Sequence, residues 1–186
     1  NILQALQYTQ TRASVKNISS FYETEPEGFS DQPMFLNIAC ELDTVLSPGD
    51  MLHFLNWIEK RMGRQASFRN APRPIDIDIL FYDDLLLDSS DLKLPHPRLH
   101  ERAFVLVPLA EIVPDLVHPV LNMTVTEMLN GVDQAGVKRV ERSLKFRIDH
   151  DVQQSRPTVS VSLSRAGVTN LQRIIQIADG GRGVLF

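Results

Sequence analysis

Two aspartates, Asp76 and Asp78, stand two residues apart in a stretch that alternates like a β-strand. Isoleucines at positions 75, 77 and 79 occupy the other face of that strand. Two carboxylates this close disfavour each other's ionisation unless a positive charge lies between them. Mg²⁺ suits such a pair because it binds one or two carboxylates, keeps several waters and accepts phosphate oxygens. The pattern predicts a metal site, with a half-exposed strand of solvated or arginine-paired aspartates as the alternative.

The residues just before this strand are basic. Arg64, Arg69 and Arg73 lie in the run from 61 to 73, whereas the run from 76 to 91 is acidic apart from its apolar residues. Arginine suits phosphate recognition because its guanidinium is a planar fork of donors. The split in charge therefore favours a local site for a multiply charged anion together with a metal. The net charge of -4 argues against a general nucleic-acid binder.

The composition is that of a folded protein. The chain has 186 residues, of which 43% are hydrophobic and 23% charged, enough for one domain or one domain plus a fragment. Cys40 is the single cysteine, which favours a reducing compartment such as the cytoplasm and a buried structural thiol. We see no signal peptide and no apolar run long enough to cross a bilayer. Asn1 and Phe186 both fall in mid-pattern, so we expect a fragment of a longer protein.

The hydrophobic periodicities predict an α+β fold. They indicate a helix over 1–12, strands over 14–24 and 35–44, a helix capped by Ser47 and ending near Gly63, a strand over 75–82, short strands within 85–94, a helix within 101–113 that begins near Pro108, a helix over 124–129, and strands over 158–163 and 171–177. With one further strand before Asn1, this order would give a ferredoxin-like βαββαβ sandwich with helices on one face of its sheet.

Several motifs resemble those of one enzyme family, in order from Asn1 to Pro119. They are Phe21-Tyr22-Glu23-Thr24, Gln32-Pro33, Leu36-Asn37, Glu59, Gly63-Arg64, Pro72-Arg73-Pro74-Ile75-Asp76-Ile77-Asp78, Pro95-His96-Pro97 and Glu101-Arg102-Ala103-Phe104-Val105-Leu106-Val107-Pro108-Leu109. This set resembles 6-hydroxymethyl-7,8-dihydropterin pyrophosphokinase, the folate-pathway enzyme that transfers pyrophosphate from ATP and releases AMP. The resemblance implies ATP and a pterin as small-molecule substrates, with neither nucleic acid nor a membrane as a partner.

The resemblance also implies a role for particular side chains. Asp76 and Asp78 would hold two Mg²⁺ ions, and Arg64, Arg73 and Arg102 would act with them as catalytic residues that grip the triphosphate. The other ATP-binding positions would be Leu52, Asn56, Glu59, Ile79 and His96. The pterin-binding positions would be Thr24, Phe35, Asn37 and Phe104. Phenylalanines offer flat apolar faces to a pterin ring, and asparagine offers its edge both a donor and an acceptor. Taken singly, Phe104 would pass for a core residue, and Asn37 and His96 for exposed ones.

The chain also departs from the family pattern. Members begin with a strand and a Gly-Ser-Asn turn, which we do not find here. A central strand would then be missing, or supplied by a neighbouring molecule. The alternative function is therefore an inactive nucleotide- or pterin-binding fragment, or an assembly module. We also expect the loops at 25–31 and 65–71 to close over bound substrates.

The end of the chain has a resemblance of its own. Asp151-Val152-Gln153, Arg156-Pro157 and the stretch from Leu163 to Asn170 resemble the opening of a type IB GTP cyclohydrolase, an enzyme with a tunnelling fold. We therefore predict a pyrophosphokinase domain over 1–146, followed over 147–186 by a linker and the β-rich start of a second domain. An irregular β-extension is the alternative for this tail. Its strands offer a route to a homo-oligomer.

Overall fold

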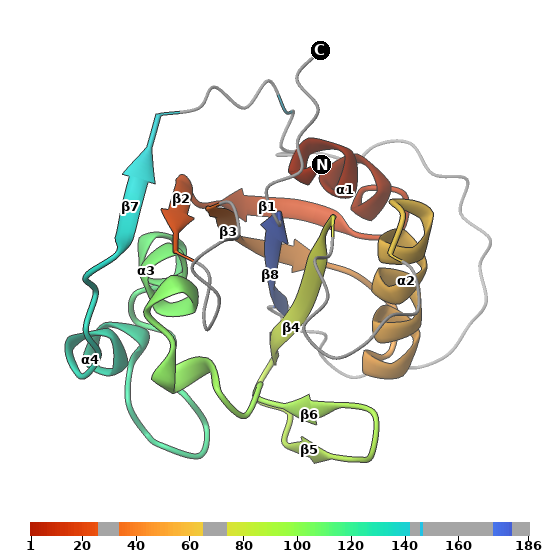
Figure 1. Cartoon of the computed structure of the whole chain (residues 1–186). Helices are drawn as coiled ribbons and strands as arrows, with labels where there is room; N and C mark the ends of the chain where they lie inside the picture. The colour runs from red at the N-terminus through yellow and green to blue at the C-terminus, as the bar shows by residue number, and fades with distance from the viewer. Residues whose placement is uncertain (26–33, 65–73, 142–145, 147–172, 180–186) are drawn as a thin grey trace.

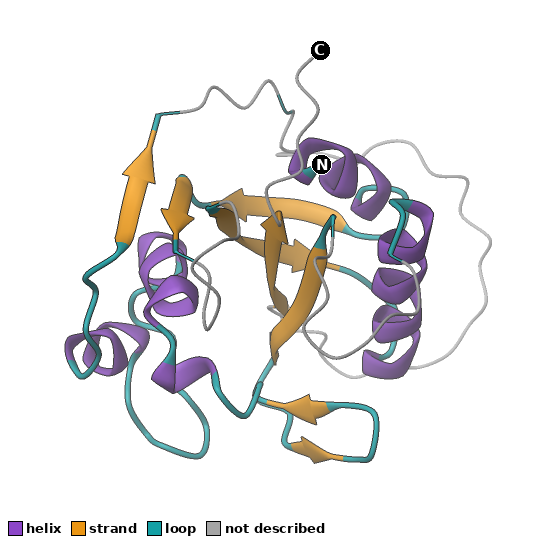
Figure 2. Ribbon diagram, viewed as in Figure 1, coloured by secondary structure: helices purple, strands orange, loops and turns teal. Residues whose placement is uncertain are grey.

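A computed structural model describes residues 1–25, 34–64, 74–141, 146 and 173–179. In chain order the elements are α1 (Ile2–Thr9), β1 (Ser14–Ile18), β2 (Phe21–Thr24), β3 (Phe35–Asp43), α2 (Pro48–Arg61), β4 (Asp76–Tyr82), β5 (Leu87–Asp88), β6 (Lys93–Leu94), the 3₁₀ helix η1 (Leu99–Glu101), α3 (Ala103–Ile112), α4 (Val125–Asn130), β7 (Val137–Val140) and β8 (Arg173–Asp179) (Figures 1 and 2). The mixed α+β class predicted from the sequence is confirmed.

One antiparallel sheet organises the fold. Its strands follow the order β4-β8-β3-β2-β7, with β1 paired to the other end of β3. The predicted strand over 14–24 is thus two strands, β1 and β2, which break at Ser19 and Ser20. The Ser19 hydroxyl accepts a hydrogen bond from the Ala39 amide at 2.9 Å, so the break is tied to β3. Strands β5 and β6 form a separate small hairpin.

Strand β8 occupies the centre of the sheet, between β3 and β4 (Figure 1). It pairs antiparallel with β3 from Leu36↔Asp179 to Leu42↔Arg173, and antiparallel with β4 from Asp76↔Ala178 to Tyr82↔Arg173. A strand predicted over 171–177 is therefore confirmed, and its place in the sheet is one that sequence periodicity does not give. The central position expected to lack a strand is filled by a segment from the far end of the chain.

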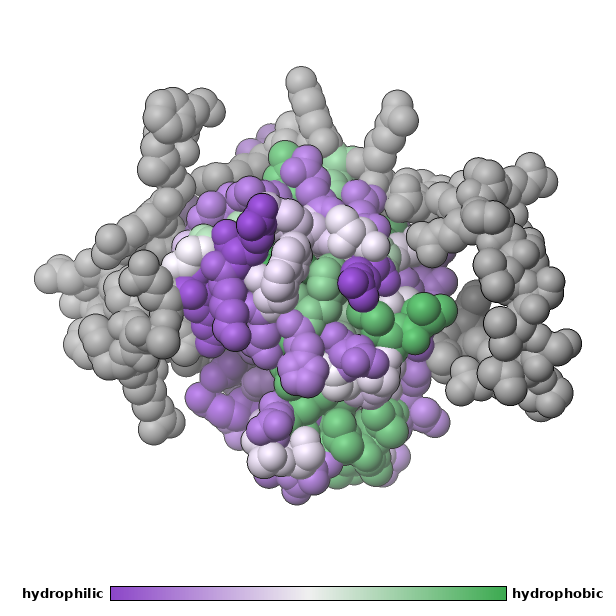
Figure 3. Space-filling model, turned by 90° about the vertical axis from the view of Figure 1, so that its right-hand side faces the viewer, coloured by the Kyte–Doolittle hydropathy of each residue, from purple (hydrophilic) through white to green (hydrophobic). Residues whose placement is uncertain are grey.

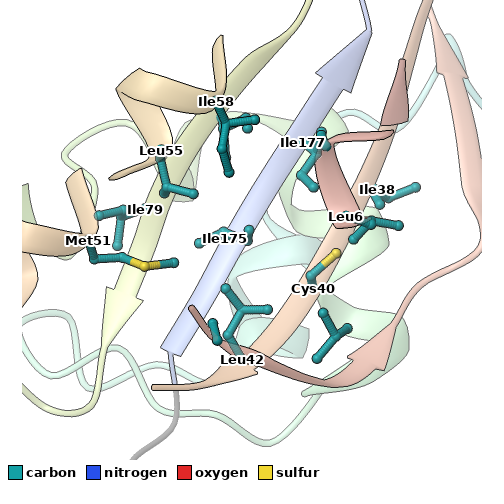
Figure 4. Close-up of a cluster of buried hydrophobic side chains, with 14 of the residues drawn as sticks. Leu6, Ile38, Cys40, Leu42, Met51, Leu55, Ile58, Ile79, Ile175 and Ile177 are labelled. Carbon is teal, nitrogen blue, oxygen red and sulfur yellow. The ribbon is translucent and has the colours of Figure 1, made fainter. Parts of the chain in front are cut away.

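The first face of the sheet packs against α1 and α2. Buried side chains of Leu6, Met51, Leu55 and Ile58 meet isoleucines of β3, β4 and β8 in one cluster (Figure 4). Helix α2 starts as predicted, because the Ser47 side chain accepts a hydrogen bond from the Asp50 amide at 3.2 Å.

The second face packs against α3 and α4. Ala39, Leu80, Phe81 and Ile174 meet apolar residues of these helices in a second cluster. Helices therefore cover both faces, and the expectation of helices on one face only was wrong. The sequence did not reveal this because α3 is apolar nearly all round, so its periodicity does not define one buried side.

Helix α3 also begins earlier than predicted. It runs from Ala103 and takes Pro108 into its interior, whereas we expected the helix to begin near that proline. Burial of Val105, Leu106 and Leu109 against the sheet offsets the hydrogen bond that proline removes.

The predicted end of α2 and the helix after Thr124 agree with the structure. Gly63 follows the end of α2 with φ of 99°, and Thr124 and Glu127 form a capping box at α4.

None of the described helices has the length and hydropathy of a membrane span. The side of the molecule with α2 carries mixed hydrophilic and hydrophobic side chains (Figure 3).

Candidate active site

The two aspartates of β4 lie on the strand face away from α2. Ile77 and Ile79 are buried in the cluster beneath α2, while Asp76 and Asp78 are only half-buried. The alternation predicted from the sequence is therefore confirmed. A β-bulge between Ile79 and Phe81 ends this alternation, so that Leu80 and Phe81 both join the second cluster while Tyr82 joins the first.

Arg64 connects the end of α2 to Asp76. Its guanidinium donates to the carboxylate of Glu59, and its Nη1 atom also lies 3.4 Å from Asp76 Oδ1. The positive φ of Gly63 turns the chain there, and the Arg64 amide donates to the Glu59 carbonyl at 2.9 Å. Arg64 of the basic run and Asp76 of the acidic run thus lie in contact.

Glu59 lies inside the fold rather than at the surface. Its side chain is 2% exposed, and its Oε1 atom accepts a hydrogen bond from the Ile77 amide at 2.8 Å. Its pKa is raised to about 7, chiefly by burial and also by the Asp76 charge, against the opposing effects of the Ile77 amide and Arg64. Glu59 therefore contributes to the predicted site indirectly, because its hydrogen bonds orient Arg64 and the start of β4.

His96 and Arg102 belong to the segment that leads into α3, and His96 contacts β4 at Leu80. The His96 amide donates to the Leu80 carbonyl at 2.9 Å. Burial lowers the pKa of His96, as do the charges of Arg102 and Arg98, against an opposing effect of Asp76. Its imidazole is thus biased toward the neutral form, next to both a cation and a carboxylate.

The guanidinium of Arg102 has one donor, Nε, that no described residue satisfies. Its guanidinium carbon lies 5.5 Å from the centroid of the Phe104 ring. Its Nε atom is buried and has no hydrogen-bond partner among the residues that the structure describes. A buried guanidinium donor without a partner is costly, and an anionic ligand would satisfy it.

The predicted pterin residues form a connected group on the neighbouring strands. Asn37 is 2% exposed, and its Nδ2 atom donates to the Thr24 hydroxyl at 2.9 Å. Phe35 is the direct cross-strand partner of Thr24. Asn37 is therefore a buried, oriented amide rather than a solvated one.

Gln176 of β8 joins this group, and sequence reasoning missed it. Its Nε2 atom donates to Asn37 Oδ1 at 3.2 Å and to the Phe104 carbonyl at 3.3 Å. The signal was present, because Gln176 is a lone polar residue in the isoleucine-rich stretch from 174 to 177. Nothing local showed that this strand lies between the two parts of the site.

The remaining predicted residues are less concentrated. Leu52 and Asn56, half-buried on α2, lie one helical turn apart, whereas the side chain of Ile79 is 3% exposed and belongs to the core. Arg69, Arg73 and most of both predicted loops are outside the described residues. Across the described part of the chain, no group of three or more histidine, cysteine or acidic side chains is arranged to hold a metal. The Asp76 and Asp78 pair is the donor set that the structure offers.

Comparison with known proteins connects this geometry to a family. The chain is 40% identical over 136 residues to "Folic acid synthesis protein FOL1" of Dictyostelium discoideum, an alignment that covers 73% of this chain but 21% of that protein. It is 47% identical over 123 residues to a protein of Methylorubrum extorquens named 2-amino-4-hydroxy-6-hydroxymethyldihydropteridine pyrophosphokinase, covering 66% of this chain and 77% of the relative. A Bacillus subtilis protein of the same name is 44% identical over 108 residues, 58% of this chain and 65% of the relative.

A family description fits the same region. The profile of 7,8-dihydro-6-hydroxymethylpterin-pyrophosphokinase matches residues 1–114, which include α1 to α3 and all of β4. Every predicted site residue lies within that match. The chain therefore belongs to the 7,8-dihydro-6-hydroxymethylpterin-pyrophosphokinase family.

Proposed function

We propose that this chain transfers pyrophosphate from ATP to 6-hydroxymethyl-7,8-dihydropterin. The observation that carries the proposal is the polar row on one sheet face. Asp76 and Asp78 lie at one end with Arg64, and Thr24 and Asn37 lie at the other. Such a row can hold a phosphate chain beside a pterin. The names of two relatives with 44% and 47% identity support the pterin substrate and the transfer of pyrophosphate.

The carboxylates of β4 fit the chemistry of Mg²⁺. Two oxygen-donor side chains on one face, neither fully buried, leave room for water and phosphate ligands. We propose that Asp76 and Asp78 hold two such ions, as the resemblance implies. When bound, Mg²⁺ neutralises charge on the phosphate oxygens. The Arg64 contact to Asp76 keeps a second positive charge at the same place.

The reaction needs positioning more than covalent help. The hydroxymethyl oxygen of the pterin forms a bond to the β-phosphorus of ATP. The bond from that phosphorus to the oxygen bridging to the α-phosphate breaks, and AMP leaves with that oxygen. The hydroxyl proton passes to solvent, and we assign no protein base. Arg102, with its unused donor, suits the charge on the phosphate chain, and Phe35 and Phe104 suit the faces of the pterin ring.

The test is AMP formation by the full chain with ATP, Mg²⁺ and 6-hydroxymethyl-7,8-dihydropterin. We expect AMP only when the pterin is present, and we expect it to vanish in Asp76→Ala. The control variant Asp115→Ala alters an exposed aspartate that lies outside the site and keeps its activity. ADP in place of AMP, or equal activity in Asp76→Ala and Asp115→Ala, would refute the proposal.

The competing function was an inactive binding fragment or an assembly module. That alternative rested on the absence of the family's first strand and Gly-Ser-Asn turn, and β8 supplies a strand between β3 and β4. The structure thus supports an active domain over a fragment. Pterin and ATP binding without turnover, measured by calorimetry, would restore the alternative.

The tail keeps its predicted assignment. We propose that residues beyond 146 begin a GTP cyclohydrolase-like part and aid self-association. Residues 151–153, 156–157 and 163–170, which carry that resemblance, are outside the described part of the chain, so the boundary at 146 stays a prediction. Strand β8 lies beyond that boundary and nevertheless pairs with β3 and β4 of the first predicted domain. Size-exclusion chromatography that shows a strict monomer would exclude the homo-oligomer.

We also propose a cytoplasmic location, because the single cysteine, Cys40, is fully buried as a free thiol. A relative from Pisum sativum is named as mitochondrial, so cell fractionation decides between the two compartments.

A further inference from the structure

Gln176 is a buried polar residue at the centre of the sheet, outside the family match at 1–114. Its side chain belongs to a residue that is 4% exposed. On one side its cross-strand partner is Ala39 of β3, and on the other it is Asp78 of β4. Gln176 therefore stands between the strand of the proposed pterin site and the strand of the proposed metal site.

The hydrogen bond to Phe104 has a cause in the sequence. In a regular helix, the amide of residue 108 would donate to the carbonyl of residue 104. Residue 108 is proline, which has no N–H, so the Phe104 carbonyl loses its helical partner. Gln176 Nε2 donates to that carbonyl at 3.3 Å instead. The first turn of α3, which presents Phe104, is thereby fastened to β8.

The hydrogen bond to Asn37 fixes the orientation of a second amide. The Phe104 carbonyl and Asn37 Oδ1 are both acceptors, so the Gln176 nitrogen must face them. With Oδ1 turned to Gln176, Asn37 directs its Nδ2 to the Thr24 hydroxyl at 2.9 Å. These hydrogen bonds run from α3 through β8 and β3 to β2. They connect Gln176 to three predicted pterin-binding residues, Phe104, Asn37 and Thr24.

We infer that Gln176 is a positioning residue for the pterin, acting through Asn37 and Phe104. The inference rests on the proposed function and adds a residue from outside the family match to that site. Gln176 would hold the Asn37 amide in one orientation, with its donor and acceptor toward the polar edge of the pterin. It would also fix the position of the Phe104 ring against the face of the pterin. If the Asn37 amide were flipped, its Nδ2 donor would face the Nε2 donor of Gln176. Gln176 therefore disfavours the flipped orientation of Asn37.

A purely structural role for Gln176 is the competing explanation, and ligand specificity separates the two. The test compares the full wild-type chain with Gln176→Met, which keeps a similar length and removes both hydrogen bonds. Calorimetry would measure the Kd of a non-hydrolysable ATP analogue with Mg²⁺, and then the Kd of 6-hydroxymethyl-7,8-dihydropterin in its presence. We expect the pterin Kd to rise about tenfold, as for one lost hydrogen-bonded contact. The ATP-analogue Kd should stay within about twofold.

Two further variants keep the result interpretable. Ile177→Val removes a methylene from the apolar face of the same strand and controls for lost stability, so its pterin Kd should match wild type. Gln176→Glu places an acceptor against two acceptors and should weaken pterin binding more than Gln176→Met does. In the Asn37→Ala background, Gln176→Met should weaken pterin binding less than it does in wild type, because the contact to Asn37 is already lost and only the hydrogen bond to Phe104 remains to be broken.

The outcomes separate this inference from the proposed function. If wild type binds the pterin and Gln176→Met binds both ligands as wild type does, the inference alone is overturned. An equal loss of both ligands in Gln176→Met and Ile177→Val also overturns it, in favour of a structural role. If wild type binds the ATP analogue but no pterin, the proposed function and the inference both fail.

Discussion

The two faces of the central sheet use the same strands for different purposes. Toward α1 and α2 the strands present Ile38, Ile77, Ile79, Ile175 and Ile177, each no more than 6% exposed. Toward α3, several of the alternate positions in these strands are polar. They are Asn37 in β3, Asp76 and Asp78 in β4, and Gln176 in β8.

This difference shows how strand alternation separates stability from chemistry. The apolar face supplies burial, while the polar face carries half-buried carboxylates and buried, oriented amides beside the start of α3. Farther along the same face, Leu80, Phe81 and Ile174 return to apolar packing against α3 and α4. The site is therefore a polar end of an otherwise packed face, and a substitution should affect either folding or ligand handling according to its face.

The largest expected effect comes from a charge on the apolar face. Ile175→Asp would bury an unpaired carboxylate beside Cys40 and Ile79, at a cost of at least about 4 kcal/mol of unfolding free energy. We expect the loss of a cooperative unfolding transition in thermal denaturation. Ile175→Val should cost only about 1 kcal/mol. A cooperative Ile175→Asp protein would mean that β8 does not lie in the sheet.

A matched change on the polar face should do the opposite. Asp78→Asn keeps the shape and removes one carboxylate charge, so AMP formation should fall about 100-fold or more. Unfolding free energy should change by less than about 1 kcal/mol, since the residue is only half-buried. The exposed Asp84→Asn serves as control in the same denaturation and activity measurements. A stability loss comparable to that of Ile175→Asp would erase the contrast between the faces.

Glu59 of α2 accepts hydrogen bonds from the Ile77 amide and from Arg64, which also contacts Asp76. The stability of the fold should therefore depend on pH through this carboxyl group. Its folded pKa is raised to about 7 from 4.5, so the protonated form favours the fold. Its contribution is complete below about pH 4.5 and is lost as pH rises through about 7. Glu59→Gln should flatten the fall in unfolding free energy over that window, by up to roughly 3 kcal/mol. Urea denaturation in the absence of Mg²⁺ measures it, and an unchanged slope in the variant would contradict the assignment.

The smallest effect should come from Thr24. Thr24→Val removes the acceptor for Asn37 Nδ2 and should weaken pterin binding by about 1 kcal/mol, or roughly fivefold. Thr44→Val is the control, because Thr44 has the same 7% exposure and its hydroxyl also makes a hydrogen bond, to the Arg12 carbonyl. Calorimetry should find weaker pterin binding in Thr24→Val alone. Equal effects in both variants would assign Thr24 to the scaffold.

Local patterns predicted the parts of the molecule that local physics determines. Alternation identified β4 and its aspartates, and Ser47 and Thr124 marked two helix starts through their side-chain oxygens. The position of β8 could not be predicted in this way, since strand pairing across more than a hundred residues leaves no periodic signal. Pro108 misled the prediction for α3, because burial against the sheet outweighed its local cost.

The candidate site divides along the same line. The family pattern supplied Asp76, Arg64, Arg102 and Asn37 by residue type and order, and the structure places them around one end of the sheet. The inward turn of Glu59 and the contribution of Gln176 depend on tertiary contacts. For Gln176, the sequence signal was a lone glutamine among isoleucines.

The most direct test of the two-face account is a crystal structure of the full chain with Mg²⁺, a non-hydrolysable ATP analogue and 6-hydroxymethyl-7,8-dihydropterin. The account predicts metal on Asp76 and Asp78, and a pterin whose edge meets Asn37 beside Phe104. Strand β8 should remain between β3 and β4, with Gln176 bonded to Asn37. Ligands bound elsewhere, or metal away from both aspartates, would contradict it.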